Sequence, residues 1–371
     1  MRLFLTVVLL AGTICLTTSC KSPAPQPPSF ATGLDSFLNH WVAPDGPGIA
    51  LLVAKGEDSI LFSRGYGLAD LNTKAPITPQ TLFNLGSVTK TMVGFGILQL
   101  QEQGKLSIED SLLHYFPGFR NKELVKNIRI KHLLSHTSGL PDNRPVAKDS
   151  VFYLTAGDAE NFAPILLNDS LLFPAGSHYE YSNPAFNGLA LIIEKVSGLK
   201  WQDYLKQNLL DKASMSSSVF TDGPYPQHGV AHGYQYTNNK WEEYDFGEYP
   251  TFCASGNGGA WSSVEELWQY EKAIRRHSFA AASTVALARQ VYRPENWADT
   301  LPPFTGFDWF VRPLEGWASV GHTGDQGGFR ADYVYFPEQG YFIAALSNGS
   351  HDLSLLRKEI VRLLKAEGTQ P

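Results

Sequence analysis

The sequence predicts an α+β (α/β) domain in which both ends of the chain build one antiparallel sheet, flanked by helices, with a mostly helical region inserted between them. Two observations predict this arrangement. Segments rich in β-branched and aromatic residues occur near both ends of the chain, and apolar residues recur at helical spacing through its middle. A cleft between the sheet and the helical region is then the natural place for a binding site.

Length and composition fit one large globular domain and exclude several classes of protein. The 371 residues carry a net charge of −6 without a basic stretch, so we expect no nucleic-acid partner. With 8 Trp, 16 Tyr and 22 Phe the chain is not disordered, and three cysteines cannot form a disulfide scaffold. We expect one domain over residues 30–371, with the sheet at about 30–75 and 300–371 and the helical region at about 76–299.

The first 29 residues are predicted to be a signal peptide followed by a tether. Arg2 precedes an apolar stretch that is too short for a comfortable membrane span, and this stretch leads through Ser19 into Cys20. The junction resembles a loose bacterial lipobox, so we expect residues 1–19 to be removed and Cys20 to be lipidated. The proline-rich residues 20–29 predict an extended spacer. The sequence thus predicts a lipid-anchored protein of the bacterial cell envelope, periplasmic or at the outer membrane. The alternative is an ordinary secretory signal.

The elements near the two ends follow from apolar spacing. Residues 30–42 have helical spacing, and residues 48–53 and 59–66 are typical of strands joined by a Lys-Gly-Glu-Asp turn. Three later segments are rich in aromatic and β-branched residues, and the chain ends in an amphipathic helix at about 353–366. The later predicted strands are 309–312, 331–336 and 341–347.

Helical patterns dominate the middle of the chain after Thr78-Pro79. The clearest are residues 92–103, 187–196 and 264–275. We therefore expect a mostly helical region to be inserted between the two parts of the chain that form the sheet.

The sharpest chemical signal is Ser87-Val88-Thr89-Lys90. A serine three residues before a lysine at the start of a helix places both side chains on one face. The helix N-terminus supplies unpaired N–H groups, and a partly desolvated lysine has a lowered pKa and takes the proton of the serine. A second Ser-x-x-Lys, at Ser197 and Lys200, contains a glycine after a helical stretch and is interpreted as a helix cap.

Tyr181-Ser182-Asn183 forms a second candidate element just before a predicted helix. Tyr181 is expected to relay protons, as a phenolate or through Lys90, and Asn183 to hold a substrate amide. The similar Tyr236-Thr237-Asn238 has flanking aromatic residues and a second asparagine, which favour the tip of a hairpin.

His322-Thr323-Gly324 leads into Asp325 and forms the third element. The glycine lets a substrate lie against the strand as an added strand, and the N–H of Asp325 joins that of Ser87 as an oxyanion hole. Taken alone, a single histidine is more often a hydrogen-bonded structural residue, so this element stays open.

The three elements in this order resemble the family of class C β-lactamases and the related serine DD-peptidases. The segments 130–140 and 258–263 also resemble that family, and the resemblance spans roughly residues 48–348. It implies a β-lactamase/transpeptidase-like fold and an acyl-enzyme hydrolase, in which Ser87 attacks a carbonyl and water later releases the acyl group. It assigns catalysis to Ser87, Lys90 and Tyr181, and substrate binding to Asn183, His322, Thr323, Gly324 and Asp325.

Other hydrolytic chemistries lack a signature. The chain has no Gly-x-Ser-x-Gly elbow, and the histidine pairs 132/136 and 228/232 lack the His-Glu-x-x-His pattern. We therefore expect neither a metal nor a cofactor.

The third element bears on the substrate. Dedicated β-lactamases of the family usually carry Lys-Thr-Gly there, whereas His322 resembles certain DD-peptidases, esterases and amidases. A neutral histidine attracts a carboxylate less than a lysine does, and Arg312 either supplies that charge or is a surface residue. Asp325 opposes an oxyanion unless its side chain turns outward.

Three functions stay open. The favoured one is a DD-peptidase or amidase acting on D-amino-acid peptides of the cell envelope. The others are an esterase or lactonase acting on a small molecule, and a penicillin-binding or sensing module with little turnover. The sequence carries no signal for an oligomeric state.

Overall fold

The structure is a computed structural model that describes residues 29–144, 156–221, 226, 229–244 and 255–368. The predicted signal segment, Cys20 and the tether up to residue 28 lie outside the described residues. Ser29, the last residue of the predicted tether, caps the first helix by accepting a hydrogen bond from the N–H of Thr32. Among the described segments, none of the helices is both long and apolar enough to cross a bilayer.

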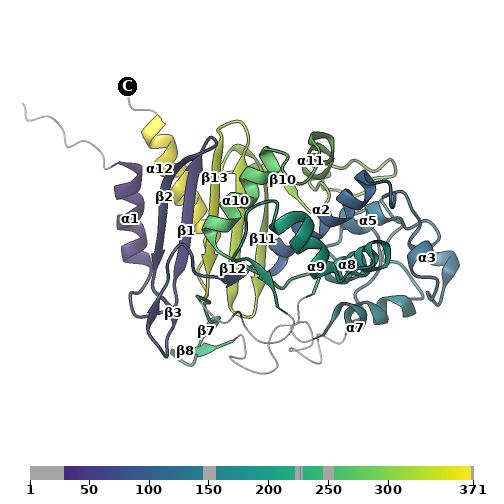
Figure 1. Ribbon diagram of the computed structural model, residues 1–371, viewed down its shortest axis with the longest axis horizontal. Coiled ribbons are helices and arrows are strands. Elements are labelled where there is room, and N and C mark those ends of the chain that lie inside the picture. The colour runs from purple at the N-terminus through teal and green to yellow at the C-terminus, as the bar shows by residue number, and fades with distance from the viewer. Residues whose placement is uncertain (1–28, 145–155, 222–225, 227–228, 245–254, 369–371) are drawn as a thin grey trace, which may run out of the picture.

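A six-stranded antiparallel sheet joins the two ends of the chain, which confirms the predicted fold class (Figure 1). The first strand of the chain pairs with the last, so that Ile49 lies opposite Ser347. The strand order is β10-β11-β12-β13-β1-β2, with β1 (Ile49–Lys55), β2 (Ser59–Tyr66), β10 (Phe310–Leu314), β11 (Trp317–Gln326), β12 (Phe329–Phe336) and β13 (Tyr341–Ser347).

Both faces of the central strands are buried, which explains their unbroken apolar runs. Along β1, the side chains of Ile49, Leu51 and Val53 pack on the face covered by α1 (Phe30–Trp41) and α12 (Leu353–Gly368). The alternate side chains of β1 pack into the larger core on the other face. In Figure 1, α1 and α12 lie at the left of the sheet and the helical region lies at its right.

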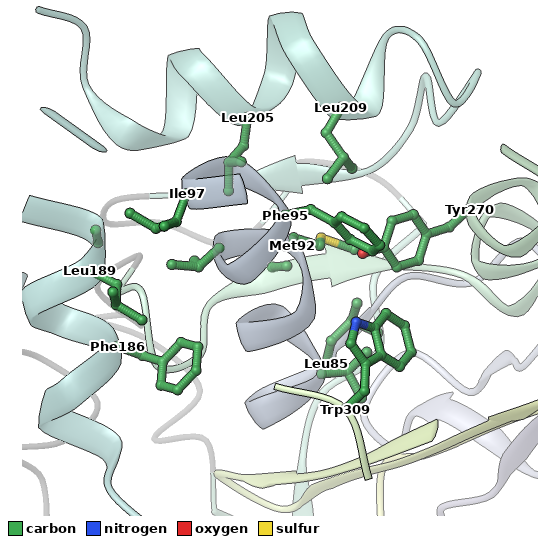
Figure 2. Close-up of a cluster of buried hydrophobic side chains, with 14 of the residues drawn as sticks. Leu85, Met92, Phe95, Ile97, Phe186, Leu189, Leu205, Leu209, Tyr270 and Trp309 are labelled. Carbon is green, nitrogen blue, oxygen red and sulfur yellow. The ribbon is translucent and has the colours of Figure 1, made fainter. Parts of the chain in front are cut away.

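Helix α2 (Thr89–Glu102) is the centre of the helical region. Every residue from Thr89 to Leu100 is buried, because other helices surround α2 on several sides (Figure 2). Its neighbours in Figure 2 include Phe186 and Leu189 from α8 (Asn183–Ser197), Leu205 from α9 (Trp201–Leu205) and Tyr270 from α10 (Val264–Arg275). A polar residue in the first turn of α2 is therefore removed from water by its position in the fold.

The remaining elements of the described segments are short. They are β3 (Leu68–Asp70), β4 (Ala75–Pro76), β5 (Phe83–Asn84), η1 (Gly86–Val88), α3 (Leu112–Tyr115), α4 (Lys122–Val125), α5 (Ile130–Leu134), α7 (Asp158–Phe162), η3 (Ala163–Leu167), η4 (Lys206–Leu210), β6 (Val219–Phe220), β7 (Tyr234–Thr237), β8 (Lys240–Glu243), β9 (Ala260–Ser262) and α11 (Ala282–Arg289).

The predicted elements are found with their ends shifted by a few residues. Helix α8 begins at Asn183 rather than 187, because the Ser182 hydroxyl caps it and Pro184 occupies its first turn. Strand β11 was not among the strands predicted from apolar spacing. Its polar and glycine residues around His322 interrupt that pattern, and its pairing with β12 holds it in the sheet.

A buried ion pair fastens the helical region to the sheet. Glu271 of α10 accepts two hydrogen bonds from Arg289 of α11, at 3.0 and 2.6 Å. The Tyr333 hydroxyl of β12 donates to the same carboxylate, and the Arg289 guanidinium lies 4.1 Å from the ring centre of Trp309. Because this guanidinium is buried, its charge depends on Glu271 for compensation.

We predict that Glu271→Gln lowers the free energy of unfolding by about 3–5 kcal/mol, because it leaves Arg289 buried without a counter-charge. Glu123→Gln is the matched control, since Glu123 pairs with Lys126 where both side chains are exposed, and it should cost less than about 1 kcal/mol. Denaturant unfolding of the two variants measures the difference, and equal effects would contradict the assignment.

Candidate active site

Ser87 and Lys90 lie together at the start of α2. Ser87 belongs to the single turn η1, and Lys90 follows in the first turn of α2. The Lys90 ammonium group donates to Ser87 Oγ at 2.9 Å and to the carbonyl oxygen of Asn257 at 2.5 Å. Its Nζ also lies 5.1 Å from the ring centre of Tyr181 and 5.8 Å from that of Phe186. The three groups predicted for catalysis therefore meet at one point.

The complete burial of Lys90 determines its protonation. Removal from water lowers its pKa from 10.5 to about 7, and the nearby positive charge of Arg144 acts in the same direction. A negative charge on Asp308 would act the other way. Near neutral pH a substantial fraction of Lys90 is thus an uncharged amine, which is the form that accepts a proton.

Tyr181 lines the same cavity as Ser87, and its ring centre lies 5.1 Å from Nζ of Lys90. Burial raises the pKa of Tyr181 well above 10, although its interaction with the Ser87 side chain lowers the pKa in part. The resting site therefore favours a neutral phenol over a phenolate. Of the two proton routes expected from the sequence, the route through Lys90 fits this environment.

A cavity of about 740 Å³ opens in front of Ser87. Apart from Lys90, which lies behind Ser87, every residue predicted for the catalytic and binding sets lines it. These are Ser87, Tyr181, Asn183, His322, Thr323, Gly324 and Asp325. The structure thus brings the predicted residues to one place, while their roles stay predictions.

Two glycines allow β11 to approach the turn that carries Ser87. A Cβ atom at Gly324 would lie 2.0 Å from the carbonyl oxygen of Leu85, and one at Gly86 would lie 2.8 Å from the backbone nitrogen of Asp325. Gly86 also has a φ of +49°. The close contact with the carbonyl oxygen of Leu85 thus explains why position 324 requires a glycine, and the sequence did not reveal this reason. The close approach sets the Asp325 nitrogen beside η1, where the predicted oxyanion hole requires it.

Two of the charged side chains at the cavity, Asp325 and Arg312, are arranged in a way that allows an anion to bind. The Asp325 side chain is 74% exposed, and its carboxylate lies 3.4 Å from Nε of Arg330, so it turns outward. Arg312 is exposed on the cavity wall, with its guanidinium 5.3 Å from the ring centre of Phe310. No carboxylate of the described ranges lies within ion-pair distance of Arg312, so it can face a ligand.

Two site residues were not singled out from the sequence. His136 follows α5. From the sequence it was considered only within the resembling segment and as part of a histidine pair that lacks a zinc pattern. Asp308 precedes β10, and no motif pointed to it. Both are buried, and the His136 ring stacks on Tyr181 with 4.4 Å between ring centres. The Asp308 Oδ1 atom lies 3.3 Å from Nε2 of His136 and 3.7 Å from Nε2 of His322. Across the described segments, no group of three or more His, Cys, Asp or Glu side chains has a geometry suited to a metal ion.

His322 is one of the residues that line the cavity. Its side chain is almost fully buried, its ring stacks on Phe310, and its Nδ1 lies 2.6 Å from the carbonyl oxygen of Thr323. Burial lowers the pKa of His322 to about 3, and the charge on Lys90 adds to this effect. His322 is therefore neutral at pH 7, as the sequence predicted for a histidine at this position.

The decoy patterns adopt the predicted local structures. Helix α8 ends at Ser197, and Gly198 caps it in a left-handed conformation with a φ of +73°. Asn238 and Asn239 both have positive φ values and connect β7 to β8 as a hairpin. Of the histidine pairs, His132 accepts a hydrogen bond from the N–H of Arg129, and residue 228 lies outside the described residues.

Asp158 of α7 is a third residue that the sequence did not reveal. It is buried, and its Oδ1 accepts hydrogen bonds of 2.8 Å from the N–H of Gly256 and from Nδ2 of Asn187. Its Oδ2 accepts a bond of 2.7 Å from the indole N–H of Trp201. Burial raises the pKa of Asp158 to about 6, although these donors oppose the shift.

The bonds of Asp158 fix the turn that holds Lys90. Ser255 and Gly258 bond to each other across this turn, and the carbonyl of Asn257 between them accepts from Lys90. Because Asp158 binds Gly256, it determines where that carbonyl lies. Asp158 is therefore a positioning residue for Lys90.

Comparison with known proteins places the chain in a family. Residues 36–367 match the Beta-lactamase family. The chain belongs to the beta-lactamase family, which confirms the resemblance found in its sequence.

Relatives and structures agree with this assignment. Penicillin-binding protein 4* of Bacillus subtilis is 28% identical over 322 residues, which cover 81% of this chain and 68% of that protein. Protein flp of Staphylococcus aureus is 25% identical over 85% of this chain and 62% of its own length. The chain thus spans about two thirds of these curated relatives.

Two solved structures share the fold. The octameric penicillin-binding protein homologue from Pyrococcus abyssi has a TM-score of 0.78 and 24% identity, over 91% of this chain and 77% of that one. The D-amino acid amidase from Ochrobactrum anthropi SV3 has a TM-score of 0.76 and 17% identity, over 91% of this chain and 99% of that one. At these identities the likeness concerns the fold.

We predict that Asp158→Asn slows the labelling of Ser87 by a fluorophosphonate by up to about 100-fold, because a small displacement of reacting groups is costly. The new amide NH₂ would face either Trp201 or Gly256, which are both donors. Asp211→Asn, an exposed aspartate, is the control. Labelling of a folded Asp158→Asn protein at the wild-type rate would refute the positioning role.

Proposed function

We propose that the protein is a serine hydrolase that works through an acyl-enzyme. The observation that carries this proposal is the 2.9 Å contact between Ser87 Oγ and a buried Lys90 whose pKa is lowered to about 7. Such an amine takes the serine proton without a histidine. Membership of the beta-lactamase family supports the same reading.

In the proposed reaction, Ser87 Oγ attacks the substrate carbonyl carbon while its proton passes to the Lys90 amine. The carbonyl oxygen becomes an oxyanion and accepts from the N–H groups of Ser87 and Asp325. The leaving group then departs with a proton that Lys90 returns through the Tyr181 hydroxyl, and the acyl group stays on Ser87 as an ester. Water attacks this ester, the same groups take its proton, and an acid is released.

The favoured substrates are D-amino-acid peptides of the cell envelope, cleaved as by a DD-peptidase or amidase. Arg312 on the cavity wall suits a terminal carboxylate, since no carboxylate of the described ranges pairs with it. Among the relatives, one is named a penicillin-binding protein and one solved structure is a D-amino acid amidase. A lipid anchor at Cys20 would hold the enzyme in the envelope beside such peptides.

An esterase or lactonase is the second candidate. Tyr179, Tyr181 and Phe310 line the cavity and offer an apolar wall to an uncharged ester. A neutral His322 also supplies no cation for a carboxylate.

We predict that Ser87→Ala abolishes hydrolysis and leaves the fold intact, because it removes one oxygen from a turn whose backbone is unchanged. Ser197→Ala is the matched control from the second Ser-x-x-Lys, and it should retain full activity. Assays with D-Ala-D-Ala peptides, p-nitrophenyl esters and nitrocefin, with circular dichroism for the fold, measure the result. Hydrolysis by Ser87→Ala would defeat the mechanism.

The same panel of substrates separates the candidate functions. Cleavage of D-Ala-D-Ala peptides supports the favoured function, while ester cleavage without peptide cleavage supports the second candidate. Stable labelling by a fluorescent penicillin without turnover would instead indicate a penicillin-binding or sensing module.

We predict that kcat/KM rises with pH and reaches half its plateau near pH 7. Below that pH Lys90 is an ammonium group and cannot accept the Ser87 proton, and above it the amine is free. A profile from about pH 5 to about pH 11 measures this midpoint. A midpoint near 10.5, the ordinary lysine value, would show that burial does not tune Lys90.

A further inference from the structure

Three buried side chains from separate segments meet behind Tyr181. His136 comes from the loop after α5, Asp308 from the segment before β10, and His322 from β11. Nε2 of each imidazole faces the same Asp308 oxygen, at 3.3 and 3.7 Å, and all three side chains are at most 1% exposed. These distances exceed that of a fully formed hydrogen bond, so they report which atoms face one another.

The position of the proton on His136 follows from its other nitrogen. Nδ1 of His136 accepts a hydrogen bond of 3.0 Å from the backbone N–H of Ser182, so it carries a lone pair. A neutral imidazole has one proton, which must then be on Nε2. His136 therefore presents a donor to Asp308.

His322 has the opposite arrangement. Its Nδ1 lies 2.6 Å from the carbonyl oxygen of Thr323, which can only accept, so Nδ1 carries the proton. Nε2 of the neutral ring is then a lone pair. His322 therefore presents an acceptor to Asp308.

Asp308 thus faces one donor and one acceptor, and a carboxylate can only accept. A carboxylic acid satisfies both, since its hydroxyl oxygen donates one hydrogen and also accepts. We propose that Asp308 is kept as a neutral carboxylic acid whose hydroxyl group directs its hydrogen toward Nε2 of His322 and a lone pair toward the N–H of His136, and that it is a positioning residue between the segments that carry Tyr181 and β11.

The surroundings of Asp308 favour the neutral form. Burial raises its pKa well above the ordinary value, against the attraction of Lys90. The alternative, a carboxylate beside a doubly protonated His322, requires an imidazolium where burial lowers the pKa to about 3 and where Lys90 and Arg312 repel it. The ionisable groups that act on Asp308 and the two histidines are Lys90, Arg312, Tyr179, Tyr181 and Tyr270.

The backbone holds Asp308 in place for this contact. Its φ is +64°, an uncommon conformation for a residue other than glycine, and that of His136 is +58°. The N–H of Asp308 donates to the carbonyl oxygen of Leu134 at 2.8 Å, which ties it to the end of α5 just before His136.

The acid connects both walls of the site. On one wall, His136 stacks on Tyr181 and binds the N–H of Ser182. On the side formed by β11, His322 lines the cavity together with the residues that follow it, Thr323 to Asp325. A carboxylate here would raise the pKa of Lys90, whereas a neutral acid leaves Lys90 able to accept a proton. This consequence for Lys90 rests on the proposed function, but the protonation of Asp308 does not.

Nitrogen-15 NMR of the histidine-labelled wild-type protein tests the protonation without an assay of activity. We expect a neutral His136 with its proton on Nε2 and a neutral His322 with its proton on Nδ1 at pH 7. An imidazolium signal from either residue, or a proton on Nε2 of neutral His322, would overturn the proposal even if the hydrolase assignment holds.

The acid limb of the pH profile gives a second test. Asp308→Asn cannot ionise, and at the position that both imidazoles face it places either an N–H donor for His322 or a carbonyl acceptor for His136. We therefore expect the midpoint set by Lys90 to stay where it is in the wild type. If Asp308 were a carboxylate, the same change would remove a negative charge and move the midpoint down by about one pH unit or more. That downward shift would overturn the proposal.

A pair of variants separates hydrogen bonding from mere space filling. Asp308→Gly keeps the left-handed backbone accessible but removes both contacts, so we expect kcat to fall by roughly tenfold or more relative to Asp308→Asn. Asp169→Asn, an exposed aspartate, is the control for the chemical change. Equal kcat values for Asp308→Gly and Asp308→Asn would refute the positioning role.

Discussion

The burial of one amine is the constraint on which the site depends. Lys90 stands in the first turn of a helix that is enclosed on several sides, so water cannot solvate its charged form. The loss of solvation, rather than a particular partner, moves its pKa toward neutrality. The carbonyl of Asn257 and the hydroxyl of Ser87 then fix where its nitrogen lies. The core of the helical region therefore both stabilises the fold and sets the chemistry of the serine.

The polar residues around this amine form two separate supports. Asp158 acts through the turn at residues 255–258 and determines the position of the carbonyl that Lys90 binds. Asp308 acts through two imidazoles and connects the Tyr181 wall to β11. Both carboxyl groups are buried, and burial raises the pKa of each. The supports differ in their partners, because Asp158 faces donors on both oxygens whereas Asp308 faces a donor and an acceptor.

Apolar spacing and short motifs predicted the sheet from both ends of the chain and the residues that meet at Ser87. These features are predictable because they are local: a strand or a Ser-x-x-Lys turn consists of consecutive residues, so its pattern can be recognised in the sequence. The roles of His136, Asp158 and Asp308 were not predictable in this way, because each depends on contacts between segments far apart in the chain. The reason for Gly324 was missed likewise, since it is the carbonyl of Leu85 that excludes a side chain there.

The pairing of β1 with β13 has a consequence for how the molecule assembles. Ile49 cannot meet Ser347 until nearly the whole chain is available, so β1 and β2 join the rest of the sheet through a contact of very long sequence separation. Such contacts close slowly, because the loop entropy is lost before the pairing rewards it. Until then β1 and β2 form a hairpin with an unsatisfied edge, prone to join the wrong strand. During synthesis α8, α9 and α10, which surround α2, are available before β11. The cavity in front of Ser87 takes shape only when β11 arrives.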